Sequence, residues 1–148
     1  MTTSDPRAVQ WLRRSCGTWN SERRYLFNLE TNKPSNMTTV FDTVELEYGR
    51  FQVTWKGNTE GIMELHLEGD LLHRSRDYFS KNGETGHSSR VSMIDDDTIV
   101  LHTHYDGLIF REEIRFLKSD IYRLRQTVGF CDRTGVARIV GQYFESRL

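Results

Sequence analysis

The chain has 148 residues, a length that suits one domain able to bury roughly 68–70% of its unfolded surface. Twenty basic and twenty-one acidic side chains give a net charge of −1, which excludes an overall field that would gather nucleic acid or an anionic membrane. Two cysteines are too few for a disulfide framework, and no apolar stretch suggests a signal peptide or a membrane span. We therefore expect a single domain over residues 1–148, soluble in a reducing, cytoplasmic compartment.

The first predicted element is a short helix in the stretch SDPRAVQWLRRSCG. Asp5 suits an N-cap, Pro6 suits the first helical position, and Gly17 suits a left-handed cap. Val9 and Leu12 share an apolar stripe, so the helix is expected to lie on a sheet or to cover the end of a barrel.

The rest of the chain alternates apolar and polar residues between turn residues, as antiparallel strands do. The predicted strands are 18–29, 37–48, 50–57, 61–69, 71–80, 87–94, 98–107, 108–116, 120–130 and 136–148. A flat sheet of so many strands would leave exposed edges, whereas an up-and-down barrel removes them. Barrels of about eight to ten strands enclose space for one small ligand. We predict a ligand-carrying barrel with one helix.

A charged hairpin is predicted in the stretch EEIRFLKSDIYRLRQT. Alternation places Arg123, Arg125 and Thr127 on one face of its second strand. A turn of three or five residues centred on Lys118 would place Glu113 opposite Arg123. Either this face is solvated and its ion pairs contribute little, or it lines a polar lumen. In a lumen the arginines would bind a carboxylated ligand and Glu113 would exchange a proton with it.

Several short motifs in order resemble the S-type phycobiliprotein lyases, also called the CpcS/CpeS family. They are CGTWNSERR after the helix, VTWKG in the middle, REEIRFLKSDIYRLRQT near the end and YFESRL at the C-terminus. The resemblance implies a lipocalin-like (calycin) antiparallel up-and-down barrel of about ten strands with a short N-terminal helix. It also implies a lyase that binds an open-chain bilin, phycocyanobilin or phycoerythrobilin. The bilin is then attached by a thioether bond to a cysteine of a phycobiliprotein α or β subunit.

The same resemblance implies no permanently bound cofactor, and it is compatible with a protein that works alone, as a homodimer or as a heterodimer with a related lyase. Carried over by position, it implies catalytic roles for Glu113 and Arg123. The bilin-binding positions it implies are Arg23, Trp55, Thr127 and Glu145, to which strand phase adds Arg125 and Trp19. Two departures affect the pocket: the connection between the first strands is short, and Arg24-Tyr25 stands where Thr-His is expected.

Each of these residues also has a structural interpretation. Arg123 and Glu113 form a surface pair in that interpretation, and Arg125 is structural. Trp55 is an ordinary core residue, Trp19 plugs the barrel bottom instead of lining its mouth, and Glu145 solvates the last strand.

Two rival functions remain open. His102 and His104 have a spacing that can bind zinc, but spacing fixes no third ligand, so no metal is expected. A barrel with internal arginines also suits a non-catalytic carrier of a bilin, haem or fatty acid.

Overall fold

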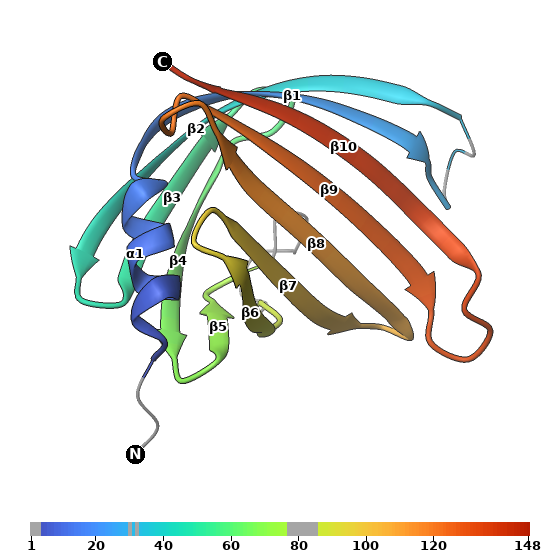
Figure 1. Ribbon diagram of the computed structural model, residues 1–148. Coiled ribbons are helices and arrows are strands. Elements are labelled where there is room, and N and C mark those ends of the chain that lie inside the picture. The colour runs from blue at the N-terminus through green and yellow to red at the C-terminus, as the bar shows by residue number, and fades with distance from the viewer. Residues whose placement is uncertain (1–3, 30, 32, 77–85) are drawn as a thin grey trace.

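The computed structural model describes residues 4–29, 31, 33–76 and 86–148, and in them one helix, α1 (Pro6–Arg14), precedes ten strands. The strands are β1 (Gly17–Phe27), β2 (Ser35–Glu47), β3 (Arg50–Lys56), β4 (Gly61–Glu68), β5 (Leu71–Arg74), β6 (Ser89–Asp95), β7 (Thr98–Tyr105), β8 (Leu108–Leu117), β9 (Tyr122–Cys131) and β10 (Ala137–Arg147). Each pairs antiparallel with the next, and β1 also pairs with β10, which closes the barrel (Figure 1). The predicted mainly β, lipocalin-like barrel with a short N-terminal helix is confirmed.

The helix begins as its sequence predicts. The Asp5 side chain caps it by accepting a hydrogen bond of 2.9 Å from the backbone N–H of Arg7, and Pro6 is the first helical residue. The C-cap is Ser15 and not Gly17. Gly17 instead starts β1 with a φ of +123°, a conformation that side-chain-bearing residues rarely adopt.

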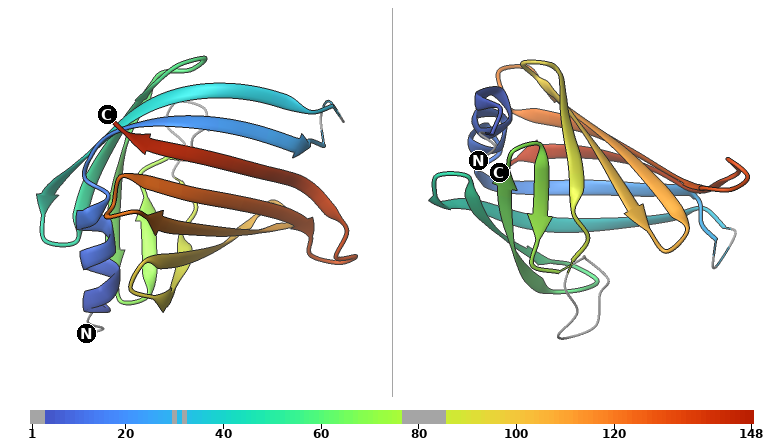
Figure 2. Two further views of the ribbon diagram at one scale, coloured as in Figure 1. Left: turned by 45° about the horizontal axis from the view of Figure 1, so that its top comes forward. Right: turned by 90° about the horizontal axis from the view of Figure 1, so that it is seen from below.

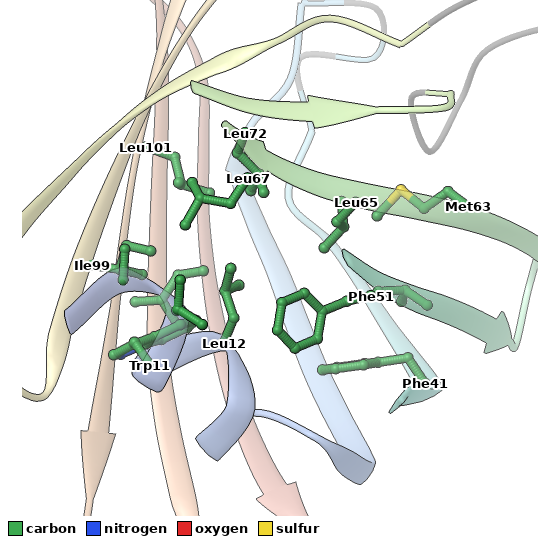
Figure 3. Close-up of a cluster of buried hydrophobic side chains, with 14 of the residues drawn as sticks. Trp11, Leu12, Phe41, Phe51, Met63, Leu65, Leu67, Leu72, Ile99 and Leu101 are labelled. Carbon is green, nitrogen blue, oxygen red and sulfur yellow. The ribbon is translucent and has the colours of Figure 1, made fainter. Parts of the chain in front are cut away.

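The predicted apolar stripe attaches α1 to one end of the barrel. Trp11 and Leu12 are buried among strand side chains such as Phe51 and Ile99 (Figure 3). The indole N–H of Trp11 also donates a hydrogen bond of 2.9 Å to the Asp97 carbonyl in the turn between β6 and β7. Burying apolar side chains of this size stabilises the fold by about 1.5–3 kcal/mol each, so α1 is an integral cover of this end.

The C-terminal strand meets α1 at the same end of the barrel (Figure 2). The Arg147 guanidinium donates hydrogen bonds to the carbonyls of Arg14 (2.7 Å), Cys16 (2.6 Å) and Asp120 (3.0 Å). Its carbon also lies 4.3 Å from the ring centroid of Trp19. These contacts connect the end of α1, the start of β1, the β8–β9 turn and β10.

The barrel wall is uneven. Strands β9 and β10 pair over most of their length, whereas β5 pairs with β6 only through Leu71↔Arg90 and Leu72↔Ser89. Strand β5 is also shorter than the predicted strand 71–80, of which residues 77–80 lie outside the described residues. The seam between β5 and β6 is thus the most sparsely paired part of the described wall.

Candidate ligand-binding site

The site begins with the turn between β8 and β9. Four residues, 118–121, separate the paired residues Leu117 and Tyr122. Lys118, Ser119 and Asp120 all have positive φ, at 45°, 52° and 67°. Arg14 of α1 holds this turn by donating to both Asp120 carboxylate oxygens, at 3.1 and 2.6 Å.

The even length of this turn overturns the predicted register. Glu113 pairs with Gln126, and Arg123 pairs with Phe116, so Glu113 does not lie opposite Arg123. The prediction assumed a turn with an odd number of residues, three or five. The four-residue turn moves the partner of Glu113 from Arg123 to Gln126, an odd number of positions. An odd shift exchanges the two faces of a strand relative to its partner. Glu113 therefore lies on the outer face with 28% of its side chain exposed, 3.8 Å from Arg115.

The carboxylate on the inner face of the hairpin belongs to Glu112. Arg125 donates to its Oε2 through Nε (2.8 Å) and Nη2 (2.5 Å), and the Thr127 hydroxyl donates to the same oxygen at 3.3 Å. Burial raises the pKa of Glu112, but the charges of Arg125 and Arg74 and these hydrogen bonds outweigh burial and hold the pKa below its usual value. Glu112 is therefore ionised at neutral pH. Glu112 would have been identified as the inward acid if the turn had been known to contain an even number of residues.

A second ion pair lies at the end of the barrel that α1 covers. Arg123 donates to Oε1 of Glu145 through Nε (3.1 Å) and Nη2 (2.7 Å), and to the Ser15 hydroxyl at 2.9 Å. Burial raises the pKa of Glu145, but the neighbouring arginine charges reverse the direction and keep it ionised. Glu145 is fully buried and thus joins a polar network, not a solvated strand.

Aromatic rings enclose the same arginine. The Arg123 guanidinium carbon lies 4.7 Å from the ring centroid of Trp19, 5.4 Å from Phe41, 5.5 Å from Trp11 and 5.9 Å from Phe116. Trp19 is itself fully buried and donates through its indole N–H to the Ser15 carbonyl at 2.9 Å. Trp19 therefore plugs the closed end, which corrects the alternative placement at the barrel mouth.

Two further predicted residues also face inward. Arg23 is buried, and its Nε donates to the Ser21 hydroxyl at 3.1 Å. Trp55 is buried on the same face of β3 as Phe51, and it lies over Gly61, where an added Cβ would be 2.1 Å from its ring. Trp55 lies toward the opposite end of β3 from Phe51, and both belong to the hydrophobic core cluster.

The structure thus brings together Arg125, Thr127 and the unpredicted Glu112 in one cluster. The Arg123–Glu145 pair lies farther along the same inner face, where Arg123 donates to Ser15 at the end of α1, and the charge of Arg125 also acts on Glu145. Tyr143, next to Arg23 and Arg125 across the sheet, was also missed as a site residue, although it shares the strand phase of Glu145.

A surface hollow of about 600 Å³ lies over β1, β9, β10 and the start of β2. Most of its lining side chains are exposed and alternate with the buried ones, so the hollow lies on the outer face of the wall. Its lining residues are Glu22, Arg23, Arg24, Asn36, Met37, Thr38, Leu124, Arg125, Gln126, Gln142, Tyr143 and Phe144.

The remaining reactive residues lie apart from the inner cluster. His102 and His104 are exposed, and no three His, Cys, Asp or Glu side chains of the described residues form a metal-binding group. Cys16 and Cys131 are free thiols. The helix within the described part of the chain is too short to cross a membrane.

A closed ten-stranded barrel with a buried arginine–glutamate cluster defines a lipocalin-like protein with a polar interior. The family model described as CpeS-like protein matches residues 61–148, more than half of the chain. The chain therefore belongs to the family of CpeS-like proteins, the S-type phycobiliprotein lyases. The matched region includes the hairpin and the YFESRL motif.

Named relatives agree with this assignment. A protein of Nostoc sp., provisionally named phycocyanobilin lyase CpcS 2, is 27% identical, with 99% of this chain and 94% of that protein covered. A protein of Picosynechococcus sp., provisionally named chromophore lyase CpcV, is 26% identical, with 100% of this chain and 85% of that protein covered. The solved S-type phycobiliprotein lyase CPES of Guillardia theta has the same fold, with a TM-score of 0.70, 18% identity, and 95% and 92% of the two chains covered.

Proposed function

We propose that this chain acts as a single domain, over residues 1–148, that attaches an open-chain bilin to a phycobiliprotein. The bilin is phycocyanobilin or phycoerythrobilin, and the acceptor is a cysteine of an α or β subunit. Membership of the CpeS-like family and the lyase names of the relatives support the activity. The observation that carries the site is the inward Glu112–Arg125–Thr127 cluster.

The interior charge suits an anionic ligand. Among the described residues three arginines are buried, and the carboxylates beside them are Glu112 and Glu145, which leaves one positive charge (3 − 2). The buried arginines are Arg23, Arg123 and Arg125, and the partly buried Arg74 and Arg147 share the inward strand phase. A bilin carries two propionates, and guanidinium groups bind carboxylates by paired, charge-assisted hydrogen bonds.

The proposed chemistry adds a thiol across the exocyclic double bond of bilin ring A. A bond forms between the cysteine sulfur and the ethylidene carbon, and the thiol proton is balanced by protonation of the bilin, so no group leaves. An ionised Glu112 would accept hydrogen bonds from the pyrrole N–H groups and stabilise a protonated, more electrophilic bilin. Held in one conformation, the bilin would react at one carbon and one face.

Co-expression with an acceptor subunit and a bilin source tests this proposal. We expect the wild-type chain to increase the yield of covalent adduct, measured by zinc-stained gels and by absorption. Glu112→Gln should reduce the initial rate about 10²-fold, the magnitude typical for loss of one preorganised electrostatic contact.

Glu113→Gln is the matched control, because it changes the neighbouring carboxylate on the outer face of the same strand. It should transfer bilin like the wild type. Equal rates for the two variants, or a larger loss with Glu113→Gln, would contradict the assignment of Glu112. A wild-type chain that binds bilin but improves neither the rate nor the site fidelity of attachment would be a carrier.

A further inference from the structure

A group of aromatic rings lies at the end of the barrel opposite α1. Tyr105 and Phe110 stand on either side of the β7–β8 turn, which is at that end (Figure 1). Their rings meet edge to face, with centroids 5.9 Å apart and an interplanar angle of 82°. The His87 ring, from the segment before β6, lies 4.3 Å from the Tyr105 ring. Two separate segments thus build one aromatic wall, defined by His87, Tyr105 and Phe110.

The inward face of β8 changes along its length from tightly packed to accessible. Alternation places Phe110, Glu112, Ile114 and Phe116 on this face. Near α1, Ile114 and Phe116 are 5% and 4% exposed and belong to the hydrophobic core. Phe110, toward the other end, is only partly buried, as is Tyr105 beside it. Side chains therefore fill the barrel under α1, whereas the interior surface near Phe110 remains accessible to a ligand.

Phe110 lies over a glycine of the neighbouring strand. It pairs directly with Gly129 of β9, and a Cβ on Gly129 would lie 2.7 Å from Phe110 Cε1 and 3.0 Å from Cδ1. Gly129 does not have a positive φ, so its backbone conformation does not require glycine. A glycine inside a strand often marks a close approach of another group, and here the group is the Phe110 ring. Because one side of the ring lies against β9, its accessible part faces the lumen.

We propose that Phe110, placed over Gly129 and contacted edge-on by Tyr105, is a stacking surface for a flat conjugated ring of the ligand. This inference rests on the proposed function, in which the ligand is a bilin and the ring is one of its pyrroles. Phe110 and Glu112 are two positions apart on one face, roughly 6.4–6.8 Å along the strand. A ligand whose N–H groups contact Glu112 therefore extends a further ring over Phe110, where offset stacking is favourable.

The test measures phycocyanobilin binding to full-length variants by absorption titration. Phe110→Leu keeps an apolar side chain but removes the ring, so we expect about three- to tenfold weaker binding and a shifted visible band of the bound bilin. Phe110→Tyr keeps the ring and should bind like the wild type. Phe130→Leu is the matched control, because Phe130 is next to Gly129 but on the outer face of β9. It should change neither the affinity nor the band.

A second variant moves the ring instead of removing it. Gly129→Ala should displace Phe110 and weaken binding by a similar factor, because its Cβ would occupy the space of the ring. The double variant Gly129→Ala/Phe110→Leu should bind no more weakly than Phe110→Leu alone, since the two changes remove the same contact.

Two results would overturn the proposal. The first is wild-type affinity and an unshifted band in folded Phe110→Leu, and the second is an equal loss in Phe130→Leu. If circular dichroism shows that Phe110→Leu does not fold, Tyr105→Leu replaces it, because it removes the edge contact to the ring. Wild-type affinity in that variant would equally contradict the stacking surface.

Parallel transfer assays separate this inference from the proposed function. A wild type that attaches bilin to its acceptor, together with a Phe110→Leu variant that binds and attaches bilin equally well, would refute the stacking surface and keep the lyase. Bilin binding that depends on Phe110, without any attachment by the wild type, would keep the stacking surface and refute the lyase.

Discussion

Among single residues, Arg123 illustrates how a buried charge is maintained in this protein. Its guanidinium and the Glu145 carboxylate neutralise one another with 5% and 0% of their side chains exposed. Removing one partner of a buried pair leaves the other charge without compensation, which costs more than the pair itself contributes. The stability of the closed end therefore depends on keeping both residues or neither.

We expect Arg123→Ala to lower the free energy of unfolding by about 3–5 kcal/mol in urea titrations. The double variant Arg123→Met/Glu145→Leu should recover most of this loss, because it removes both charges and preserves volume. A single variant with wild-type stability would show that Glu145 is not held by this pair.

The stability of the fold at acid pH should depend on the ionisation of Glu112. Its folded pKa is depressed below the ordinary value of about 4.3. The unfolded chain therefore binds a proton at Glu112 before the folded chain does. The resulting stabilisation is present above about pH 4.3 and is lost as the pH falls through the folded pKa.

Urea titrations between pH 7 and pH 3 should therefore show a steeper loss of stability for the wild type than for Glu112→Gln. Glu113→Gln should follow the wild type. Parallel curves for the wild type and Glu112→Gln would contradict the depressed pKa.

The two cysteines should differ in reactivity. Hydrogen bonds from the Thr134 side chain and from the backbone of Arg133 and Thr134 lower the pKa of Cys131 to about 7. Burial raises the pKa of Cys16. Because the thiolate is the nucleophile, iodoacetamide should modify Cys131 first, with a rate that rises through a midpoint near pH 7. Cys131→Ser should abolish this fast phase, and a fast phase that persists would assign it to Cys16.

Among the elements, the β3–β4 hairpin depends on a glycine. A Cβ at Gly61 would lie 2.1 Å from the Trp55 ring, well inside contact distance, so Gly61→Ala must displace the indole. We expect a changed Trp55 fluorescence and weaker bilin binding, with Gly107→Ala as a control, since a Cβ at Gly107 meets no atom within 4 Å. Gly107 has a φ of +79°, so its variant reports the cost of backbone strain without a packing effect.

The positions of the helix and strands were more predictable from the sequence than the register between neighbouring strands. Alternation located all ten strands, and the Asp5–Pro6 pattern located the start of α1. Alternation also grouped Arg123 with Arg125 correctly. It could not relate β8 to β9, because that relation depends on the number of turn residues, and three consecutive residues with positive φ and no glycine gave no recognisable turn signal.

On the scale of the whole molecule, the barrel is held most firmly where α1, β1, β9 and β10 meet, and least firmly at the β5–β6 seam. Local opening follows the density of pairing and packing. In hydrogen-exchange mass spectrometry, the backbone amides of 71–74 should exchange before those of 122–131. Equal protection of the two segments would contradict a weak seam.

The barrel class followed from the number and alternation of strands, which are properties of the whole chain. The sequence did not predict that the interior holds two ion pairs, Arg123–Glu145 beneath α1 and Arg125–Glu112 farther along the same face. This arrangement depends on which end α1 covers, and Ser15, the residue that links α1 to Arg123, gives no such signal in the sequence.

The adjacent acids Glu112 and Glu113 have a consequence for comparing relatives of different length. A family member whose β8–β9 turn is one residue shorter or longer would present the other glutamate to the interior, because neighbouring strand residues face opposite ways. With two adjacent glutamates, one of them still faces inward after a one-residue insertion or deletion in the turn. A single glutamate would be turned to the outer face. Alignments that match these glutamates column by column, without counting the turn residues, would assign the inward-facing acid to the wrong residue.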